Sequence, residues 1–332
     1  MTVPSDETLL RRIADRTTEW RFHCWYWGDA IAIDGLLEAH TLGIGEYRGH
    51  VVETLLRWHL HCLPNFDDVL APGAAIMRLV MDGDLPAAAA DRLLGQLTGL
   101  PCAVGSVPAL EPHRHFERFG VCIDAVYHLP ATFALAARLK GDRTLAARGV
   151  EIASDCMRVL RCKGGWAQWF DPVRRCNNAV PWSRGLGWAV LGMLDLVDLL
   201  DGEAPDAVLE LAGQVLERLA LTQEPDGNWA AVLDHAAGGF ETSTAAFYVA
   251  AALHPASAGF AAFPSPVLER AAASCRHALG ADGAYTGVSA DVLPRWGLES
   301  YEHRPTEPSP WAQGAGLRAF AGLVRATRPP SP

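Results

Sequence analysis

Asp124 is a single carboxylate within a largely apolar stretch, FGVCIDAVYHLP, that runs from Phe119 to Pro130. A buried carboxylate without a partner is costly, so such a residue is paired, turned toward solvent or kept for chemistry. Apolar surroundings raise the pKa of a carboxyl group, and one that stays protonated near neutral pH can act as a general acid. Asp124 is therefore a candidate acid–base catalyst.

Other residues suited to chemistry lie in long segments rich in Trp, Gly, His and charge. These segments cover residues 19–30, 62–73, 109–120, 163–188, 223–243 and 295–316. Sugars present apolar C–H faces together with hydroxyl groups, so aromatic faces beside a few polar groups are typical of a carbohydrate pocket. A small sugar is the expected partner.

The segments between these loops show apolar residues at three- and four-residue spacing and are rich in Ala and Leu, which predicts helices. The clearest helical stretches are residues 30–42, 47–63, 131–139, 143–160, 187–200, 206–221 and 242–253. The theme of helix, short turn with Gly and an acidic residue, then helix recurs at 36–55, 76–94, 133–153 and 194–216. Chained helical hairpins of this kind indicate a solenoid or a closed toroid.

About six hairpins fit in the chain, which favours an all-α fold, an (α/α)6 barrel in which loops after alternate helices gather at one end. No linker divides the chain. We expect a single barrel domain over residues 15–325, preceded by a lead-in over 1–14 and followed by a disordered tail over 326–332.

The chain has 332 residues and a formal net charge of −10, which argues against nucleic-acid and anionic-membrane partners. The N-terminus does not have the pattern of a signal peptide, and no long apolar run predicts a membrane span. The eight cysteines form no CxxC pair and are interpreted as reduced thiols. We therefore expect a cytoplasmic protein, a monomer or homodimer, without a metal or other cofactor.

Several ordered stretches resemble the unsaturated uronyl hydrolases, glycoside hydrolase families 88 and 105, and family 105 more closely. The most specific are WSRGLGW at 182–188 and the ID of 123–124, which a helix and the GD of 141–142 follow. The others are 25–37, 67–73, 164–171, 223–234, 241–247, 287–289 and 311–323. The resemblance covers roughly residues 15 to 325 and also implies an (α/α)6 barrel.

In these families the substrate is a uronic acid with a C4=C5 double bond, left by a polysaccharide lyase. The resemblance makes Asp124 the carboxylic acid that protonates C4 and then accepts a proton from the water that adds at C5. The resulting hemiketal opens and expels the aglycone. The expected activity is that of a glycosidase acting on a rhamnogalacturonan- or glycosaminoglycan-type disaccharide.

The resemblance also assigns further site residues. Asp68 matches a second acidic position, which would raise the pKa of Asp124, although Asp68 or its neighbour Asp67 could instead cap a helix. His113 is the expected pocket histidine, and with His115 it supplies only two metal ligands.

In WSRGLGW, the resemblance makes Trp188 a stacking platform and Arg184 a polar contact, with Trp182 beside them. Gly185 and Gly187 are expected to permit an unusual backbone there. The alternative is that the tryptophans are core residues and that Arg184 lies on the surface.

Trp27 and Trp229 are further expected pocket residues, and Trp229 could equally be structural. Two positions depart from the family pattern: Cys122 replaces a common aromatic residue, and Gln168 replaces a usual histidine. Both positions touch substrate in the family, so these changes bear on the identity of the sugar.

Other functions remain open. The same toroid occurs in sugar epimerases, which use paired histidines, and in zinc-dependent lanthionine cyclases, which need converging Cys and His ligands. A family member with an altered substrate, such as a natural-product tailoring enzyme, or an inactive carbohydrate-binding protein would also fit the two departures.

Overall fold

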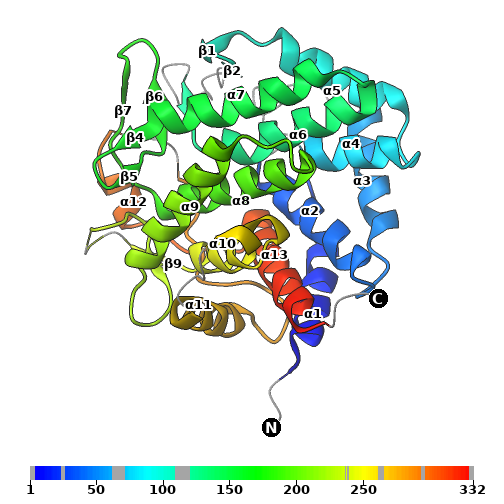
Figure 1. The fold of residues 1–332 in the computed structure, drawn as a ribbon. Helices are drawn as coiled ribbons and strands as arrows, with labels where there is room; N and C mark the ends of the chain where they lie inside the picture. Colours follow the sequence, from blue (N-terminus) through cyan, green and yellow to red (C-terminus); the bar gives the residue numbers. More distant parts are fainter. Residues whose placement is uncertain are drawn as a thin grey trace.

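Six parallel inner helices form a closed ring in the computed structural model, which describes residues 4–23, 27–61, 72–108, 120–235, 237, 239–260, 265–292 and 296–328. The inner helices are α2 (Trp27–Thr41), α4 (Gly73–Met81), α6 (Ala125–Lys140), α8 (Ser183–Leu199), α10 (Ser243–Ala252) and α13 (Pro310–Thr327). Each contacts the next in this order, and α13 returns to α2, which closes the ring. The predicted (α/α)6 barrel is confirmed (Figure 1).

Six outer helices pack against this ring. They are α1 (Asp6–Thr18), α3 (Arg48–His61), α5 (Ala87–Gly99), α7 (Arg143–Leu160), α9 (Asp206–Leu221) and α11 (Ser265–Ala278). Each outer helix contacts an inner helix that adjoins it in the chain, and α1 also contacts α13. Helix α1 spans the boundary expected at residue 14, and α13 continues to Thr327, into the range expected to be a tail.

The two rings differ in how much of each helix they bury. Every residue of α10 is buried, whereas α7 buries a stripe formed by Gly149, Ile152, Ala153, Cys156, Met157 and Leu160. Such a stripe is the amphipathic pattern of a helix with one face in water, and a helix that is apolar all round belongs in the interior. The sequence patterns thus set which helices lie inside.

Short turns join the inner helices α2, α4, α6 and α8 to the outer helices that follow them. After α6, Gly141 adopts the left-handed conformation (φ 68°), and Asp142 caps α7 by accepting a 2.9 Å hydrogen bond from the backbone N–H of Thr144. The four predicted hairpins correspond to α2–α3, α4–α5, α6–α7 and α8–α9.

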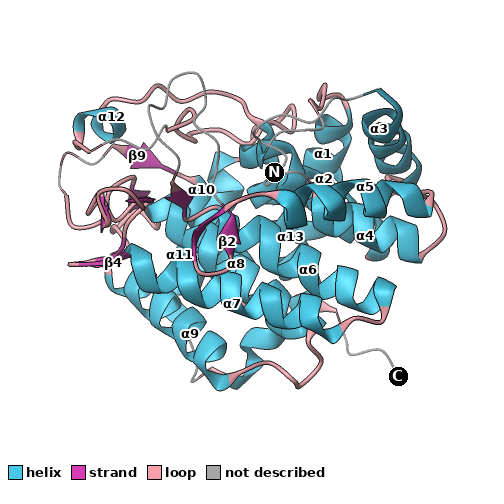
Figure 2. Cartoon of the chain, turned by 90° about the horizontal axis from the view of Figure 1, so that it is seen from above, coloured by secondary structure: helices cyan, strands magenta, loops and turns pink. Residues whose placement is uncertain are grey.

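The longer connections lead from the outer helices back to the starts of inner helices and carry short strands. These are β1 (Cys102–Val104), β2 (Val107–Pro108), β3 (Val121–Cys122), β4 (Arg161–Cys162), β5 (Gly165–Trp166), β6 (Trp169–Asp171), β7 (Cys176–Asn177), β8 (Trp229–Ala230) and β9 (Phe240–Glu241). The 3₁₀ helix η2 (Pro255–Gly259) and the short helix α12 (Glu299–Glu302) complete the elements. Figure 2 shows β4, β9 and α12 on the same side of the helical rings. In the described part of the chain, no helix is both long and apolar enough to cross a membrane.

Candidate active site

The starts of the inner helices meet at the loop-bearing mouth of the barrel, because an outer helix runs back between each inner helix and the next. Trp27 begins α2, Asp124 directly precedes α6, and Arg184 lies in the first turn of α8. The fold therefore brings predicted site residues from distant parts of the chain to one end of the barrel.

Asp124 is buried, with 7% of its surface exposed. The Cys122 thiol donates a 3.3 Å hydrogen bond to its Oδ2, while its Oδ1 has no hydrogen-bond partner among the described residues. Burial raises the pKa of Asp124 from 3.8 to about 6, against smaller lowering effects of the Cys122 hydrogen bond and the Arg184 charge. At pH 7 roughly a tenth of this carboxyl is therefore protonated, far more than of an aspartate with the ordinary pKa.

A three-stranded antiparallel sheet, with strand order β3-β6-β7, positions Asp124. Cys122 pairs with Trp169, and the backbone N–H of Ile123 donates a 3.0 Å hydrogen bond to the Gln168 carbonyl. Because Asp124 comes directly after these paired residues and directly before α6, its backbone is held on both sides.

Gln168 is buried, and protein atoms contact both ends of its side-chain amide. Nε2 donates a 2.9 Å hydrogen bond to the Val292 carbonyl, and Oε1 accepts one from the Tyr301 hydroxyl. Gln168 occupies the position where the family pattern has a histidine. Its two hydrogen bonds connect Val292 and Tyr301, in the C-terminal loop region, to the sheet beside Asp124.

Arg184 and Glu241 form a fully buried ion pair with an N–O distance of 3.1 Å and no exposed side-chain surface on either partner. Arg184 also donates to the carbonyls of Ser289 and Ala290, at 2.7 and 3.1 Å. Its guanidinium lies over the Trp182 ring, 4.8 Å from the centroid. The alternative that Arg184 is a surface residue is wrong.

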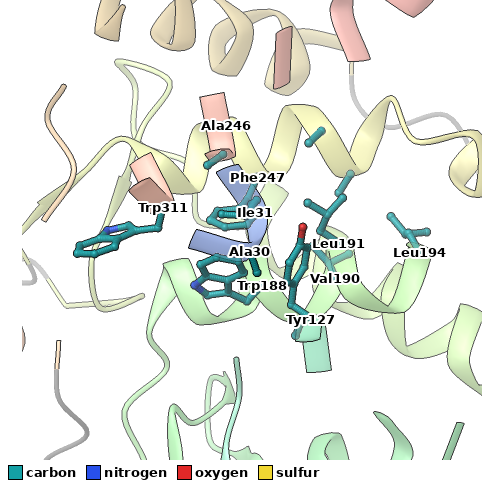
Figure 3. Close-up of a cluster of buried hydrophobic side chains, with 14 of the residues drawn as sticks. Ala30, Ile31, Tyr127, Trp188, Val190, Leu191, Leu194, Ala246, Phe247 and Trp311 are labelled. Atoms are coloured by element: carbon teal, nitrogen blue, oxygen red, sulfur yellow. The ribbon is translucent and has the colours of Figure 1, made fainter. Parts of the chain in front are cut away.

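Trp188 lies inside an aromatic cluster and is fully buried. Figure 3 shows its ring among side chains that include Tyr127 and Phe247, whose ring centroids lie 4.9 and 4.8 Å away. Trp27 meets Trp188 edge-on at 6.1 Å and stacks on Trp311 at 4.7 Å. The half-buried Trp27 is the more accessible ring of this cluster.

Gly185 and Gly187 do not have the unusual backbone that was predicted, because both lie within helix α8 and neither has a positive φ. Their role is close packing. A Cβ on Gly185 would lie 2.6 Å from Ile123 Cγ2, and one on Gly187 would lie 2.6 Å from Phe247 Cβ. These glycines let α8 approach the residue before Asp124 and the neighbouring helix α10.

Trp229 is 1% exposed and packs against Tyr248 of α10, with ring centroids 5.3 Å apart. Its indole N–H donates a 2.8 Å hydrogen bond to the Leu219 carbonyl on α9. These contacts support a structural role. Two expected site residues, Asp68 and His113, lie outside the described residues, as do Asp67 and His115.

His128 and Trp311 were not singled out from the sequence. His128 is four residues after Asp124 on α6, is 3% exposed and has no hydrogen-bond partner for either ring nitrogen among the described residues. Burial lowers its pKa to about 3, so it is neutral near pH 7. The helical spacing from Asp124 was the available signal for His128. For Trp311 it was a Pro at the preceding position, where helices often begin.

The described ranges contain no group of three or more His, Cys, Asp or Glu side chains that could hold a metal ion. What they place at the mouth is a buried carboxyl with a raised pKa, an adjacent thiol, a buried arginine and a wall of aromatic rings. This combination suits acid–base chemistry on a sugar.

Comparison with known proteins agrees with this class. The model of Glycosyl Hydrolase Family 88 matches residues 167–327. A search of curated protein sequences found no match.

Solved structures match almost the whole chain at low sequence identity. A possible member of glycoside hydrolase family 105 from Klebsiella pneumoniae has a TM-score of 0.81 at 15% identity, over 97% of this chain and 93% of that one. A family 105 glycoside hydrolase from C. acetobutylicum has a TM-score of 0.80 at 15% identity, over 96% and 99%. The unsaturated glucuronyl hydrolase of Bacillus sp. GL1 has a TM-score of 0.71 at 15% identity, over 97% and 95%. These likenesses show the shared fold, and with the family-model match they confirm the resemblance to glycoside hydrolase families 88 and 105.

Proposed function

We propose that this protein is a glycoside hydrolase that hydrates the C4=C5 double bond of an unsaturated uronyl sugar and releases the aglycone, with Asp124 as general acid and base. The observation that carries the proposal is the state of Asp124, which is buried, has a pKa of about 6 and presents one oxygen without a partner among the described residues. A catalytic acid works best when its pKa lies near the working pH.

The reaction consumes one water molecule and returns Asp124 to its starting state. The carboxyl proton moves to C4 as the double bond's electron pair forms the new C–H bond, which leaves positive charge at C5. Water adds at C5, and its proton passes to the Asp124 carboxylate. The hemiketal at C5 then opens to a ketone as the bond between C5 and the ring oxygen breaks, which leaves a hemiacetal at C1. This hemiacetal collapses to an aldehyde as the bond from C1 to the aglycone oxygen breaks, and the aglycone leaves as an alcohol.

The surroundings of Asp124 support each stage. Burial favours the protonated acid before the first transfer, while the Cys122 hydrogen bond and the Arg184 charge stabilise the carboxylate after it. Trp27, which is half-buried and stacks on the buried Trp311, offers aromatic surface for a sugar ring. A rhamnogalacturonan- or glycosaminoglycan-type disaccharide is the proposed substrate.

A histidine-based epimerase is less well supported by the described residues. Such chemistry needs a histidine that can accept a proton near neutral pH, whereas burial holds the pKa of His128, one helical turn from Asp124, at about 3. Among these two neighbouring groups, the carboxyl is the one suited to proton transfer.

The test is loss of the ultraviolet absorbance of the conjugated double bond, followed with unsaturated disaccharides from pectin, ulvan and glycosaminoglycan lyases. Wild-type protein and Asp124→Asn are compared with Asp201→Asn, an exposed control at a positive φ of 48°, which asparagine tolerates well. Decay with wild type and the control but not with Asp124→Asn supports the proposal. Decay with none of the disaccharides, or undiminished decay with Asp124→Asn, contradicts it.

A further inference from the structure

Trp296 is 47% exposed, and every other tryptophan in the described part of the chain is buried or half-buried. Tryptophan is buried on average and contributes strongly to contact surfaces, where its large ring packs against a partner. An exposed ring held in a fixed position is therefore a candidate contact for a ligand.

Arg174 holds this ring from one side, with its guanidinium 4.9 Å from the Trp296 ring centroid. Arg174 lies in the turn between β6 and β7, and Asp171 stabilises that turn. The Asp171 Oδ1 accepts hydrogen bonds from the backbone N–H groups of Val173 and Arg174, at 2.8 and 2.9 Å. The Asp171 hydrogen bonds thus fix the backbone of the turn that places Arg174 over the Trp296 ring.

The sheet connects the pair to the candidate active site. Trp169 pairs with Cys122, two residues before Asp124, and Arg174 follows Trp169 by five residues, which is at most roughly 17 Å of extended chain. On the other side, Val292 and Tyr301, which flank Trp296 in the sequence, both hydrogen bond to Gln168. Figure 1 shows the β6–β7 hairpin and α12 on the same side of the barrel.

Two arginines lie at the β6–β7 turn beside the Asp171 carboxylate, whose Oδ2 is 3.7 Å from Arg174 Nε. Arg174 and Arg175 are both exposed at the β6–β7 turn of a protein with a net charge of −10. An arginine beside an aromatic ring can bind a carboxylate or sulfate group while the ring packs against the apolar face of a sugar. The local chemistry thus matches an acidic saccharide.

We propose that Arg174 and Trp296 form an outer subsite for an acidic sugar of the aglycone, beyond the unit attached directly to the unsaturated uronyl residue. This inference rests on the proposed function, because the proposed function places the unsaturated end of the substrate at Asp124 and so directs the aglycone away from it. It extends the proposed substrate class from the disaccharide to longer acidic oligosaccharides.

Calorimetric titration in the Asp124→Asn background measures binding without turnover. The probes are an unsaturated glycosaminoglycan disaccharide, the corresponding tetrasaccharide, and a tetrasaccharide whose only acidic group is that of the unsaturated unit. Trp296→Ala should weaken binding of both tetrasaccharides roughly three- to tenfold. Arg174→Gln should weaken mainly the acidic one, and neither change should affect the disaccharide. Val173→Ala, exposed in the same turn, is the matched control.

Equal affinity of Trp296→Ala and its parent for the acidic tetrasaccharide overturns the subsite, as does failure of the parent to bind it. An equal loss for the disaccharide also overturns it, because the ring would then act at the inner site. The proposed function is tested separately by turnover. Binding that depends on Trp296 in a protein that does not consume the double bond supports the subsite and contradicts the hydrolase. If the protein consumes the double bond but tetrasaccharide binding does not depend on Trp296, the hydrolase is supported and the subsite is contradicted.

Discussion

The Cys122 thiol donates a 3.3 Å hydrogen bond to Oδ2 of Asp124. Burial, followed by the nearby Asp124 charge, raises the thiol's own pKa, so Cys122 stays protonated and remains a donor. The bond favours the ionised carboxylate and leaves Oδ1 as the oxygen without a partner among the described residues. The transferable proton of Asp124 therefore belongs on Oδ1.

Replacing Cys122 should move the pH dependence of the proposed reaction. Cys122→Ala removes the hydrogen bond that lowers the pKa of Asp124, so this pKa rises and the acid stays protonated to higher pH. The alkaline limb of kcat/KM should shift upward. Cys122→Ser keeps a donor and should not show this upward shift. The measurement is loss of double-bond absorbance across pH.

Cys275→Ala is the control for removing a buried thiol, because Cys275 lies on α11. Its pH profile should match that of wild type. A downward shift in Cys122→Ala, or an equal shift in Cys275→Ala, would show that the thiol does not set the pKa of Asp124 in this way.

Asp124→Asn should increase stability above pH 6 while it abolishes turnover. The folded state raises the pKa of this carboxyl from 3.8 to about 6, so ionisation costs stability progressively as the pH rises between these values and fully above them. Two pKa units correspond to about 3 kcal/mol, and Asn cannot ionise. Urea unfolding at pH 7 should therefore show a higher free energy of unfolding for Asp124→Asn.

This gain should shrink toward pH 4, where Asp124 is protonated in the folded protein and half-protonated when unfolded. Asp201→Asn, on the surface, should show no comparable pH-dependent gain. An advantage of Asp124→Asn that stays constant from pH 4 to pH 8 would mean that ionisation of this carboxyl is not its cause.

The ring of helices was predictable because its determinants are local. The spacing of apolar residues marks each helix, and the Gly141–Asp142 pair marks the turn between α6 and α7, so four hairpins could be placed from the sequence. The same local pattern around Asp124 indicated a buried carboxyl. These features depend on neighbours within a few residues.

The long-range contacts around the site were not predictable in this way. Gln168 bonds to Val292 and Tyr301, which are 124 and 133 residues further along, and this pairing exists only after the barrel closes. Gly185 was interpreted as backbone freedom, but its small size matters because Ile123 packs against it. A single sequence does not show which surface faces a glycine.

Arg184→Met should destabilise the protein by about 3–5 kcal/mol, because it leaves the fully buried Glu241 charge without its partner. Adding Glu241→Gln should recover part of that loss. Urea unfolding of both variants measures the effect, with the exposed Arg143→Met, whose ion pair is at the surface, as the control. If the free energy of unfolding of Arg184→Met lies within about 1 kcal/mol of the wild-type value, which is the size expected for a surface pair, the buried pair is not a main determinant of stability.

Gly192→Ala should test the packing of α8 against α6 directly. A Cβ at Gly192 would lie 2.2 Å from the Val126 carbonyl oxygen and 2.4 Å from the Tyr127 Cα, and because both are backbone atoms the helices must move apart. Overpacking of this kind costs about 1–3 kcal/mol, and the displaced start of α6 carries Asp124, so turnover should fall as well.

Gly95→Ala, on an exposed face of α5 with no atom within 4 Å of the new Cβ, should instead stabilise the protein by about 0.5–1 kcal/mol. Urea unfolding and double-bond absorbance measure the two effects. Gains in stability from both substitutions would show that α6 and α8 do not pack this closely in solution.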